Sequence, residues 1–520
     1  MSSRSNDVMN VAQGSPPGIP DETLVALADN QRNAGQHVAL GHKLSRMRRF
    51  VEAEACNRKA IELNPNHPMA HNNLGWTRQM QGDYVEAEAN YERALELDPG
   101  LTFARRNLAR LLVQLGRQGE SLHLWHQEIQ TGSAGIEWLQ GLISTALRTR
   151  NLGFAGEYAA ILAGLRWGSP WYPPRPDRSL PPLPVQPTPV FLTIPKLRHD
   201  IEQFLYLQSQ GVLGDEFTAI IKDYQDVIDR LTPRGINVRA PLDSEAQRTI
   251  GHVYNRIVHV RHAPRLPRAL SGKWDATTVE FQYLNRPPGV VVVDDFLSPE
   301  ALESVRLFCL ESTVWSGNRY AHGRLGAFLH DGFNCPLLLQ VAEELREALP
   351  RVIGDRYSLR QLWGFKNGHS LPGDSTTHAD FAAVNVNFWI TPTEANLDET
   401  CGGLVVYGVD APLNWDFATY NGRADIIKPF LHRQQARSIT IPYRQNRAVI
   451  FNSDLFHGTS ELRFRKGYEN RRVNITMLYG DREHDVHHRH LARPDPMGDP
   501  TGGATSWRSA AFARTRRPQR

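Results

Sequence analysis

Apolar residues recur every three to four positions between residues 34 and 166, which is the spacing of amphipathic helices. The pattern starts near residue 21, and we expect the polar, Gly- and Pro-containing start at 1–20 to be disordered. Similar helical spacing covers 193–232. Beyond residue 290 the pattern changes to short runs of β-branched and aromatic residues, typical of strands. The chain is therefore expected to be helical first and mixed α and β afterwards.

Part of the helical region repeats itself with a period of 34 residues. Gly41 returns as Gly75, and Pro65 returns as Pro99. Small residues let two helices cross closely, and each proline ends a helix. A weaker third copy and a poorer fourth copy follow. This period and these marks resemble the tetratricopeptide repeat, so we predict a helical solenoid over residues 21–166.

A linker and a second helical segment separate the solenoid from the strands. Residues 167–192 are rich in proline and predict an extended spacer, although a strap packed on a domain is the competing interpretation. Residues 193–270 are predicted to form a bridging segment with two amphipathic helices. The pair His199-Asp200 lies here. Because neighbouring residues on a helix diverge by about 100°, we interpret this pair as a surface or capping pair.

Strand patterns dominate residues 271–482. A valine run at 290–293 predicts a buried strand. Ser298 is a good N-cap and Pro299 suits the first helical turn, so a helix to about residue 313 is expected. A second helix is expected at 337–349. Further strands are predicted at 359–365, 384–390, 404–407, 438–441, 448–452 and 473–479.

Two candidate metal ligands, His378 and Asp380, lie two positions apart. On a strand such residues point to the same face. Of the 20 histidines, His378 alone has an Asp at this spacing. His457 follows downstream at the end of another strand pattern. Two imidazoles and one carboxylate form the facial triad that holds non-haem Fe(II) and leaves positions open for other ligands.

Arg472 follows His457 by fifteen residues and begins the last predicted strand. By alternation it shares one strand face with Asn474 and Thr476. A buried arginine needs a fixed anion, because an unpaired buried charge is costly. A dicarboxylate co-substrate would supply that anion through a bidentate ion pair.

The order of these residues resembles the Fe(II)/2-oxoglutarate-dependent dioxygenases. The strand at 472–481 is similar to the final core strand of the prolyl-hydroxylase branch, and 385–390 and 402–407 are similar to phytanoyl-CoA-dioxygenase-like members. The resemblance covers 284–482. It implies a double-stranded β-helix (jelly roll) with flanking helices over 271–482. The whole chain would then be a multidomain α + β protein with an N-terminal α-solenoid.

The resemblance also implies the cofactors and their ligands. Fe(II) would be held by His378, Asp380 and His457, Arg472 would bind the far carboxylate of 2-oxoglutarate, and O2 would be the second co-substrate. The remaining assignments are Asn385 or Asn387 near the other carboxylate and Trp363, Phe365 or Lys366 on the opposite wall.

The stretch 410–428 interrupts the strands and carries Trp415, Phe417 and Tyr420. Long insertions beside a site often cover the substrate, so these aromatic residues are candidate lid residues. A plain surface loop is the competing interpretation.

Composition and charge narrow the remaining choices. The 520 residues carry a net charge of +4, which is too small to argue for nucleic acid. Four cysteines lack CxxC spacing and predict reduced thiols in a cytoplasmic protein. No apolar run approaches the roughly 18 residues of a membrane span, and the start lacks the apolar stretch of a signal peptide. The basic, His-rich tail at 483–520 is expected to be disordered and outside the site.

Three functions remain open from the sequence. The favoured one is hydroxylation of a protein or peptide substrate that the helical repeats recruit. The second is hydroxylation of a small molecule, with the repeats used for dimerisation, so that the protein would be a homo-oligomer. The third is a protein-binding scaffold with a degenerate oxygenase domain. The intact set of four polar site residues argues against the third.

Overall fold

A computed structural model describes residues 33–130, 136–170, 191–235, 238–318, 323–371 and 377–482. The predicted disordered start at 1–20, most of the Pro-rich linker at 167–192 and the tail at 483–520 lie outside these ranges. The chain divides into two compact units, the first containing the helices up to residue 130 and the second containing the elements from residue 136 onward.

Helix pairs build the first unit. Within residues 33–130 the pairs are α2 (Ala34–Arg46) with α3 (Phe50–Leu63), α4 (Pro68–Gln81) with α5 (Tyr84–Leu97), and α6 (Thr102–Gln114) with α7 (Gln118–Gln130). The first helices of successive pairs begin 34 residues apart, so the predicted period is confirmed. Gly75 of α4 lies so close to α5 that a Cβ there would meet the Tyr91 ring at 2.9 Å. The predicted close crossing is therefore confirmed.

A fourth helix pair keeps the same spacing but belongs to the second unit. It consists of α8 (Ile136–Arg148) and α9 (Leu152–Trp167). Gly156 of α9 packs against Leu339 of α15 (Pro336–Ala348), and a Cβ on this glycine would lie 2.7 Å from Leu339 Cδ1. The side chains of Arg166 and Trp167 each donate to Asp331 Oδ1 at 2.9 Å. The range 21–166 predicted for the solenoid therefore spans both units.

The bridging segment contains the two predicted amphipathic helices. Its elements are α10 (Ile194–Ser209), α11 (Phe217–Leu231), the 3-10 turn η1 (Thr232–Arg234), β2 (Ala240–Pro241) and α12 (Ser244–Thr249), and β2 pairs with β1 (Phe191–Leu192) at the end of the predicted linker. Phe204 of α10 packs on Phe217 and Tyr224 of α11, with ring centroids 5.3 and 5.5 Å apart. These helices have their own apolar core.

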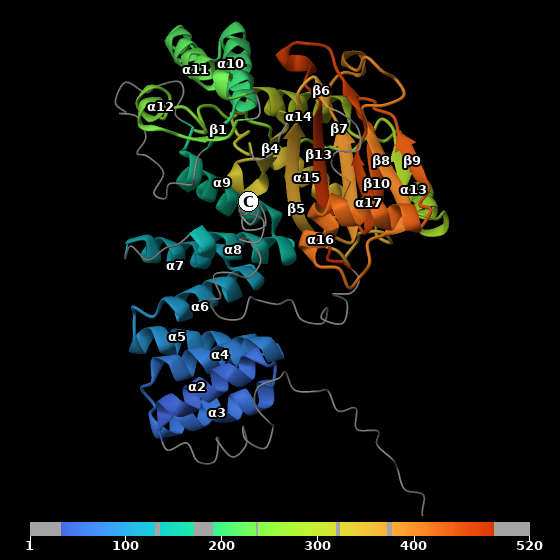
Figure 1. Ribbon diagram of the computed structural model, residues 1–520. Coiled ribbons are helices and arrows are strands. Elements are labelled where there is room, and N and C mark those ends of the chain that lie inside the picture. Colours follow the sequence, from blue (N-terminus) through green and yellow to red (C-terminus); the bar gives the residue numbers. More distant parts are fainter. Residues whose placement is uncertain are drawn as a thin grey trace, which may run out of the picture. The chain divides into compact units, whose positions relative to one another are not determined.

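Six antiparallel strands form the main sheet, in the order β3-β10-β7-β13-β5-β4 (Figure 1). They are β3 (Val291–Val293), β4 (Leu325–Phe328), β5 (Leu359–Lys366), β7 (Val384–Trp389), β10 (Ala448–Asn452) and β13 (Val473–Tyr479). A second antiparallel sheet has the order β11-β8-β9, and β12 pairs with β6. These strands are β6 (Ser370–Leu371), β8 (Leu404–Asp410), β9 (Ser438–Ile441), β11 (Leu455–Thr459) and β12 (Leu462–Arg463).

The strands predicted at 359–365, 384–390, 404–407, 438–441, 448–452 and 473–479 agree with observed strands, whereas the segment around His378 is not a regular strand and the valine run differs in one detail. Val291 and Val293 are buried but Val292 is 42% exposed, so the prediction of a buried strand is met on one face of β3 only. The remaining helical elements are α13 (Ala276–Asn285), α14 (Pro299–Glu311), α16 (Phe417–Gly422), α17 (Ala424–Arg433), η3 (Leu329–Asp331), η4 (Thr393–Ala395) and η5 (Tyr468–Asn470). Ser298 caps α14 as predicted, accepting from Ala301 N at 3.1 Å.

A buried polar cluster joins α10 to β5 and η5. Lys196 Nζ lies 2.5 Å from the carboxylate of Asp200, which also meets His199 Nδ1 at 3.0 Å. Lys366 Nζ donates to Cys309 O at 2.9 Å and to Tyr468 Oη at 2.6 Å. His199 is 0% exposed and Asp200 is 4% exposed. The interpretation of this pair as a surface or capping pair was therefore wrong.

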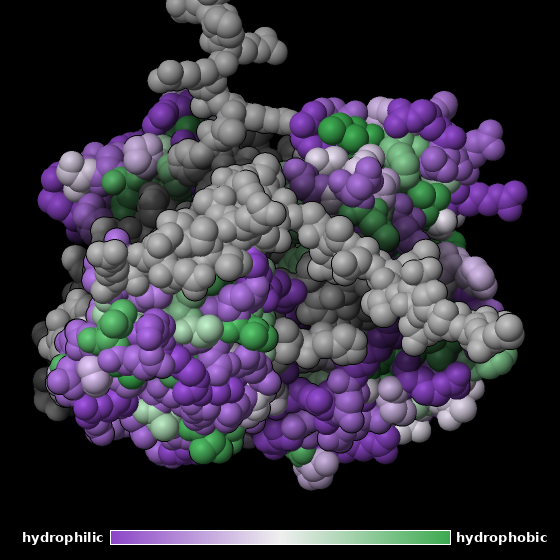
Figure 2. Space-filling view, turned by 90° about the horizontal axis from the view of Figure 1, so that it is seen from below, coloured by the Kyte–Doolittle hydropathy of each residue, from purple (hydrophilic) through white to green (hydrophobic). Residues whose placement is uncertain are grey.

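Scattered apolar residues remain on the surface. On the face drawn in Figure 2, hydrophobic residues form small groups among hydrophilic ones. Single exposed apolar side chains are normal for a folded protein and do not mark a docking site. Among the described helices, none has the length and apolar character needed to cross a membrane.

Candidate metal centre

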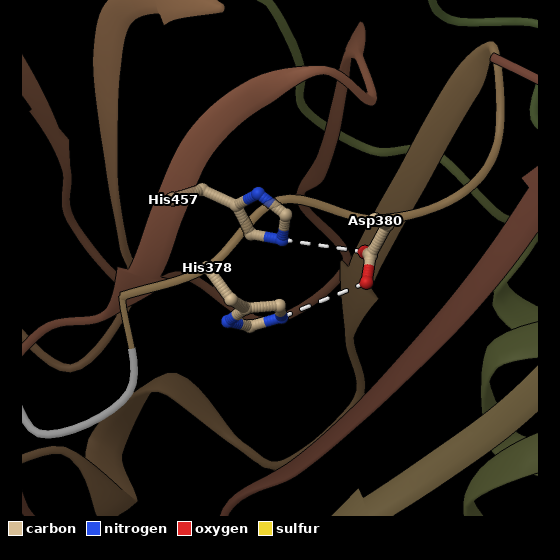
Figure 3. Close-up of side chains that lie close together, drawn as sticks. All are labelled: His378, Asp380 and His457. Atoms are coloured by element: carbon tan, nitrogen blue, oxygen red, sulfur yellow. Dashed lines mark ion pairs between the residues drawn. The ribbon is translucent and has the colours of Figure 1, made fainter. Parts of the chain in front are cut away.

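His378, Asp380 and His457 converge in the second unit (Figure 3). Their potential ligand atoms all lie within 4.8 Å of one another. His457 Nε2 is 3.4 Å from Asp380 Oδ2, and His378 Nε2 is 3.7 Å from Asp380 Oδ1. Both imidazoles thus direct Nε2 towards one carboxylate, and the three candidate ligands of the sequence lie together.

The backbone around His378 and Asp380 is not a regular strand. His378 forms an isolated antiparallel bridge with His457 of β11, with N–H to O distances of 2.9 and 2.8 Å. Asp380 donates its N–H to Ser453 O at 3.1 Å. The prediction that alternation on a strand places these ligands on one face was wrong. Their convergence comes instead from separate backbone contacts to β11 and to the turn before it.

Ala379, between the two ligands, is held by α16. Its N–H donates to Tyr420 O at 3.0 Å, and its carbonyl accepts from Asn421 Nδ2 at 2.8 Å. The insertion that carries the candidate lid residues is therefore mostly helical and is bonded to the ligand loop. Asn421 was not singled out from the sequence, because nothing local connects it with residue 379.

Aromatic packing fixes the candidate lid segment on the second sheet. The Trp415 ring centroid lies 5.0 Å from Phe430 and 6.1 Å from Phe456 of β11. Phe417 meets Tyr420 at 5.5 Å. Tyr420 is buried and lies 4.2 Å beneath the guanidinium of Arg482. The role of Trp415, Phe417 and Tyr420 as a substrate lid stays a prediction.

Asp380 is built to remain ionised. Burial acts to raise its pKa, but the contact with His457 and the nearby positive charges outweigh burial, so the pKa lies below its usual value of 3.8. His457 Nδ1 lies 3.0 Å from Leu455 O. A proton on Nδ1 that donates to this carbonyl leaves Nε2 with its lone pair directed at the site.

A hydrogen-bonded row of polar side chains runs from Asp380 to Arg472. Asn385 Nδ2 donates to Asp380 Oδ2 at 2.8 Å, and Asn387 Nδ2 donates to Asn385 Oδ1 at 2.6 Å. Asn474 Nδ2 continues to Asn387 Oδ1 at 3.3 Å, and Arg472 donates to Asn474 Oδ1 at 3.0 Å. Register explains the row, since β7 and β13 are neighbouring strands and directly opposite side chains share a face.

Arg472 is a buried cation that meets neutral oxygens. It is 1% exposed and donates to Gly402 O at 2.6 Å, to Gly403 O at 3.3 Å and to Asn474. In the part of the chain that the structure describes, no carboxylate lies within ion-pair distance of it. Burial lowers its pKa to about 9. The predicted burial of this arginine is confirmed, and its surroundings favour a bound anion.

Two aromatic residues of β5, Trp363 and Phe365, flank the row. They are two of the three residues proposed for the opposite wall of the site. Phe365 lies opposite Asn474, and Trp363 lies opposite Thr476, so both share the face of the polar row. Lys366 belongs to the other face, where it joins the cluster at α10. Its assignment to the wall was wrong because adjacent strand residues point in opposite directions. Arg324, stacked on Phe365 at 3.9 Å, was not identified from the sequence.

The donor set fits both groups that the resemblance implies. Two imidazole nitrogens and one carboxylate oxygen suit Fe(II), and leave the remaining positions for exchangeable ligands. Arg472 suits the far carboxylate of 2-oxoglutarate, because a guanidinium binds a carboxylate through two parallel N–H donors. Asn385 lies against Asp380, so it orients a metal ligand. Its expected contact with the co-substrate, like that of Asn387, stays a prediction.

Comparison with known proteins identifies one helical repeat. The tetratricopeptide repeat family matches residues 68–101, which include α4 and α5. A crystal structure of MamA is similar at 20% identity and a TM-score of 0.20, covering 21% of this chain and 64% of that one. YrrB, described as a TPR protein with an unusual peptide-binding site, is similar at 20% identity and a TM-score of 0.22, covering 26% and 70%. No curated protein matches the chain. The chain therefore contains a tetratricopeptide repeat.

Proposed function

We propose that the second unit is an Fe(II)/2-oxoglutarate-dependent dioxygenase on a double-stranded β-helix. One observation carries the proposal. His378, Asp380 and His457 converge at one end of a buried polar row. At the other end lies Arg472, a cation with no carboxylate within ion-pair distance among the described residues. A metal and a dicarboxylate together satisfy both ends of this row.

The strand order supports the jelly-roll interpretation. From β7 onward the chain passes repeatedly between the two sheets. β7 is in the main sheet, β8 and β9 are in the second, β10 returns to the main sheet, β11 is in the second and β13 is in the main sheet. Such alternation winds two antiparallel sheets around one interior. The ligand His457 on β11 and the cation Arg472 before β13 then both lie next to this interior.

The residues of the chain have separate tasks in the reaction. The chemistry supplied by bound iron is oxidation by O2, in which 2-oxoglutarate becomes succinate and CO2 and one oxygen atom enters a substrate C–H bond. Arg472 would hold the far carboxylate and thereby orient the co-substrate. Asn385 fixes one oxygen of Asp380. The contacts of Ala379 with α16 hold the ligand loop, so the ligands are positioned before binding.

An anaerobic titration tests the metal and co-substrate assignment. Fe(II) and 2-oxoglutarate are added to the full-length protein while the weak visible charge-transfer band of a chelated keto acid is followed. We expect the band in the wild type and in His262→Ala, which changes an exposed histidine, but not in His378→Ala. A folded wild-type protein without the band contradicts the proposal and favours the scaffold function.

For the substrate, we propose a protein or peptide recruited by the helical repeats. The repeat match and the peptide-binding description of YrrB support this choice. Succinate formation with candidate peptides is compared between the full-length protein and a variant that lacks residues 1–130. This variant retains α8 and α9, because they pack within the second unit. Loss of peptide-dependent turnover is expected.

Two other functions make different predictions in the same experiment. A small-molecule hydroxylase that uses the repeats for dimerisation keeps its turnover without residues 1–130 but changes its oligomeric state, which sedimentation measures. A scaffold with a degenerate oxygenase domain forms no succinate, with or without residues 1–130. Its full-length form still binds a partner through the repeats.

A further inference from the structure

We propose that the open edge formed by β3 and β9 binds an extended acidic segment of a partner protein, which pairs with β9 as an additional strand. The edge lies in the second unit and consists of Val292 of β3 and residues 437–441, which include β9. None of these residues belongs to the candidate metal centre, to the polar row or to the helical repeats. The inference therefore goes beyond the proposed function.

The backbone of β9 offers hydrogen-bonding groups on its outer side. Among the described strands, β9 is the last of the second sheet, and residues 438–440 are exposed. Gly408 of β8 donates its N–H to Arg437 O at 2.9 Å, and the register continues along β9 without a shift. Because alternate residues of an antiparallel strand bond to a given neighbour, Ser438 and Thr440 direct their N–H and C=O groups away from β8. Such groups are a template for one more strand.

Apolar side chains of the core between the two sheets reach this edge. Val292 lies opposite Val449 of β10, and Ile439 lies opposite Val406 of β8. Val449 and Val406 belong to one buried apolar cluster, and opposite side chains share a face. Val292 and Ile439 therefore continue this core, although they are 42% and 43% exposed. An added strand with an apolar side chain on this face would remove both from water.

Contacts at both ends hold β3 beside β9. Before the strands, a Cβ on Gly408 would lie 3.9 Å from Pro288 Cγ and 3.7 Å from Arg437 O. After the strands, Arg444 Nη1 lies 3.0 Å from Asp294 Oδ2. The half-exposed apolar residues lie between these two contacts, so they form one continuous surface.

Exposed cations lie at the start of the edge. Arg437 is exposed and, by alternation, shares its strand face with Ile439. Arg286 is exposed in the turn that contains Pro288, where its carbonyl accepts from Gly289 N at 2.8 Å. Among the described residues, no carboxylate lies within ion-pair distance of the guanidinium of Arg437 or Arg286. This end of the edge is therefore positively charged.

The opposite end also carries more positive than negative charge. Arg444 and Arg447 both pair with the carboxylate of Asp294. A second copy of this chain at the edge would bring the same cations together, whereas the carboxylates of an acidic segment would pair with them. The charge therefore favours an acidic partner over self-association.

Fluorescence anisotropy of a labelled peptide tests the edge. The probe is acetylated Thr-Glu-Thr-Val-Thr-Glu-Thr with a C-terminal fluorophore, because its glutamates and valine share one face of a strand. The control peptide has glutamine in place of both glutamates. Each peptide is titrated with the full-length protein without added metal, so the result is independent of the proposed function.

Three protein variants are compared with the wild type. Arg437→Gln removes a cation of the edge. Thr440→Pro removes an N–H that points away from β8, so β9 keeps its bonds to β8 while the outer side loses a donor. Arg198→Gln is the matched control, since it changes an exposed arginine of α10.

We expect saturable binding of the glutamate peptide to the wild type and to Arg198→Gln. The glutamine peptide should bind the wild type about two- to fivefold more weakly, and Arg437→Gln should bind the glutamate peptide more weakly by a similar factor, because exposed ion pairs are lost. Thr440→Pro should bind about tenfold more weakly, because a backbone hydrogen bond is lost.

Several results overturn the inference. They are no saturable binding to the wild type, equal affinity for the two peptides, and undiminished binding by a folded Thr440→Pro variant. If circular dichroism shows that Thr440→Pro is unfolded, Arg437→Gln decides, and wild-type affinity in that variant overturns the inference. A wild-type dimer in sedimentation that dissociates in Arg437→Gln or Thr440→Pro would mean that a second copy occupies the edge, which also overturns it.

Discussion

Two buried polar clusters of the second unit lie on opposite faces of the same strands. In the cluster at α10, Lys196 meets the carboxylate of Asp200 and Arg471 Nε lies 2.7 Å from Glu202 Oε2, so these cations have acidic partners within the chain. In the polar row, Arg472 meets neutral oxygens. A buried cation paired within the fold indicates a structural role. A buried cation that meets only neutral oxygens among the described residues favours a bound anion.

The two clusters also differ in how they can respond to burial. Burial lowers the pKa of Lys366 well below its usual value, and a lysine relieves its burial by losing a proton. Arginine holds its proton far more strongly, so Arg472 stays charged and favours a bound anion. Adjacent residues of one chain segment thus belong to different clusters: Arg471 contacts Glu202 in the cluster at α10, and Arg472 belongs to the polar row.

The largest effect is expected at the metal end of the row. Asp380→Ala removes the carboxylate between two imidazoles, so we expect no detectable succinate from 2-oxoglutarate. The matched control is Asp355→Ala, whose carboxylate is 79% exposed and which should keep wild-type turnover. Normal turnover by Asp380→Ala would contradict the ligand assignment. The polar row would then have no functional role to set against the structural cluster at α10.

Arg472 and its neighbour give the sharpest contrast between the clusters. Arg472→Met should weaken 2-oxoglutarate binding by about 30-fold or more, the equivalent of about 2 kcal/mol for a charged partner left unpaired. Arg471→Met should leave this affinity unchanged, because the Arg471 side chain pairs with Glu202 of α10. Dissociation constants come from the anaerobic titration. Equal losses in both variants would mean that the two faces are not functionally distinct.

Two residues of the cluster at α10 should contribute very differently to the free energy of unfolding. Asp200→Ala leaves Lys196 buried without its carboxylate and should cost about 3–5 kcal/mol of unfolding free energy. Lys366→Met should change stability by less than about 1 kcal/mol, because methionine fills similar space. Tyr468 keeps its bond to Leu310 O, and Cys309 O keeps Trp315 Nε1 as a donor. Urea unfolding measures both variants, and similar losses would contradict this division.

The smallest effect concerns acid stability. Burial lowers the pKa of His199 well below its usual 6.5. The unfolded chain therefore binds a proton below about pH 6.5 that the folded chain does not bind, so stability falls as the pH falls. Between pH 7 and pH 5, the wild type should lose about 1–2 kcal/mol more than His199→Phe.

The control for this experiment is His262→Phe, which changes an exposed imidazole. It should follow the pH dependence of the wild type. If His199→Phe also follows the wild type, protonation of His199 does not limit acid stability, and the cluster at α10 owes its pH response to other groups.

Much of the fold follows from local patterns, as the repeat shows. A period of 34 residues placed the helix pairs of the first unit, because each repeat packs on its neighbour in sequence. The strands were predicted well for a related reason, since β-branched runs and alternation are local. The motif around His378 was read as a strand for the same reason, but its shape depends on β11 and α16, which lie far away in the sequence.

The sequence predicted which residues form the site, but it did not predict the hydrogen bonds and packing contacts that connect them. His378, Asp380, His457 and Arg472 carry distinctive chemistry at distinctive spacing. Arg324 carries no such mark, and its place became visible only through the pairing of β4 with β5. His199 and Asp200 were misjudged because helix geometry describes the angle between side chains but not which side another element covers.

One consequence follows from the bonding of Ala379 to α16. Its amide proton exchanges with solvent water only when Tyr420 O releases it, so the exchange rate of this single amide counts the openings of α16. A molecule that seats against α16 slows that rate even if it never touches the metal. The exchange rate of the Ala379 amide thus measures how often the ligand loop and α16 separate.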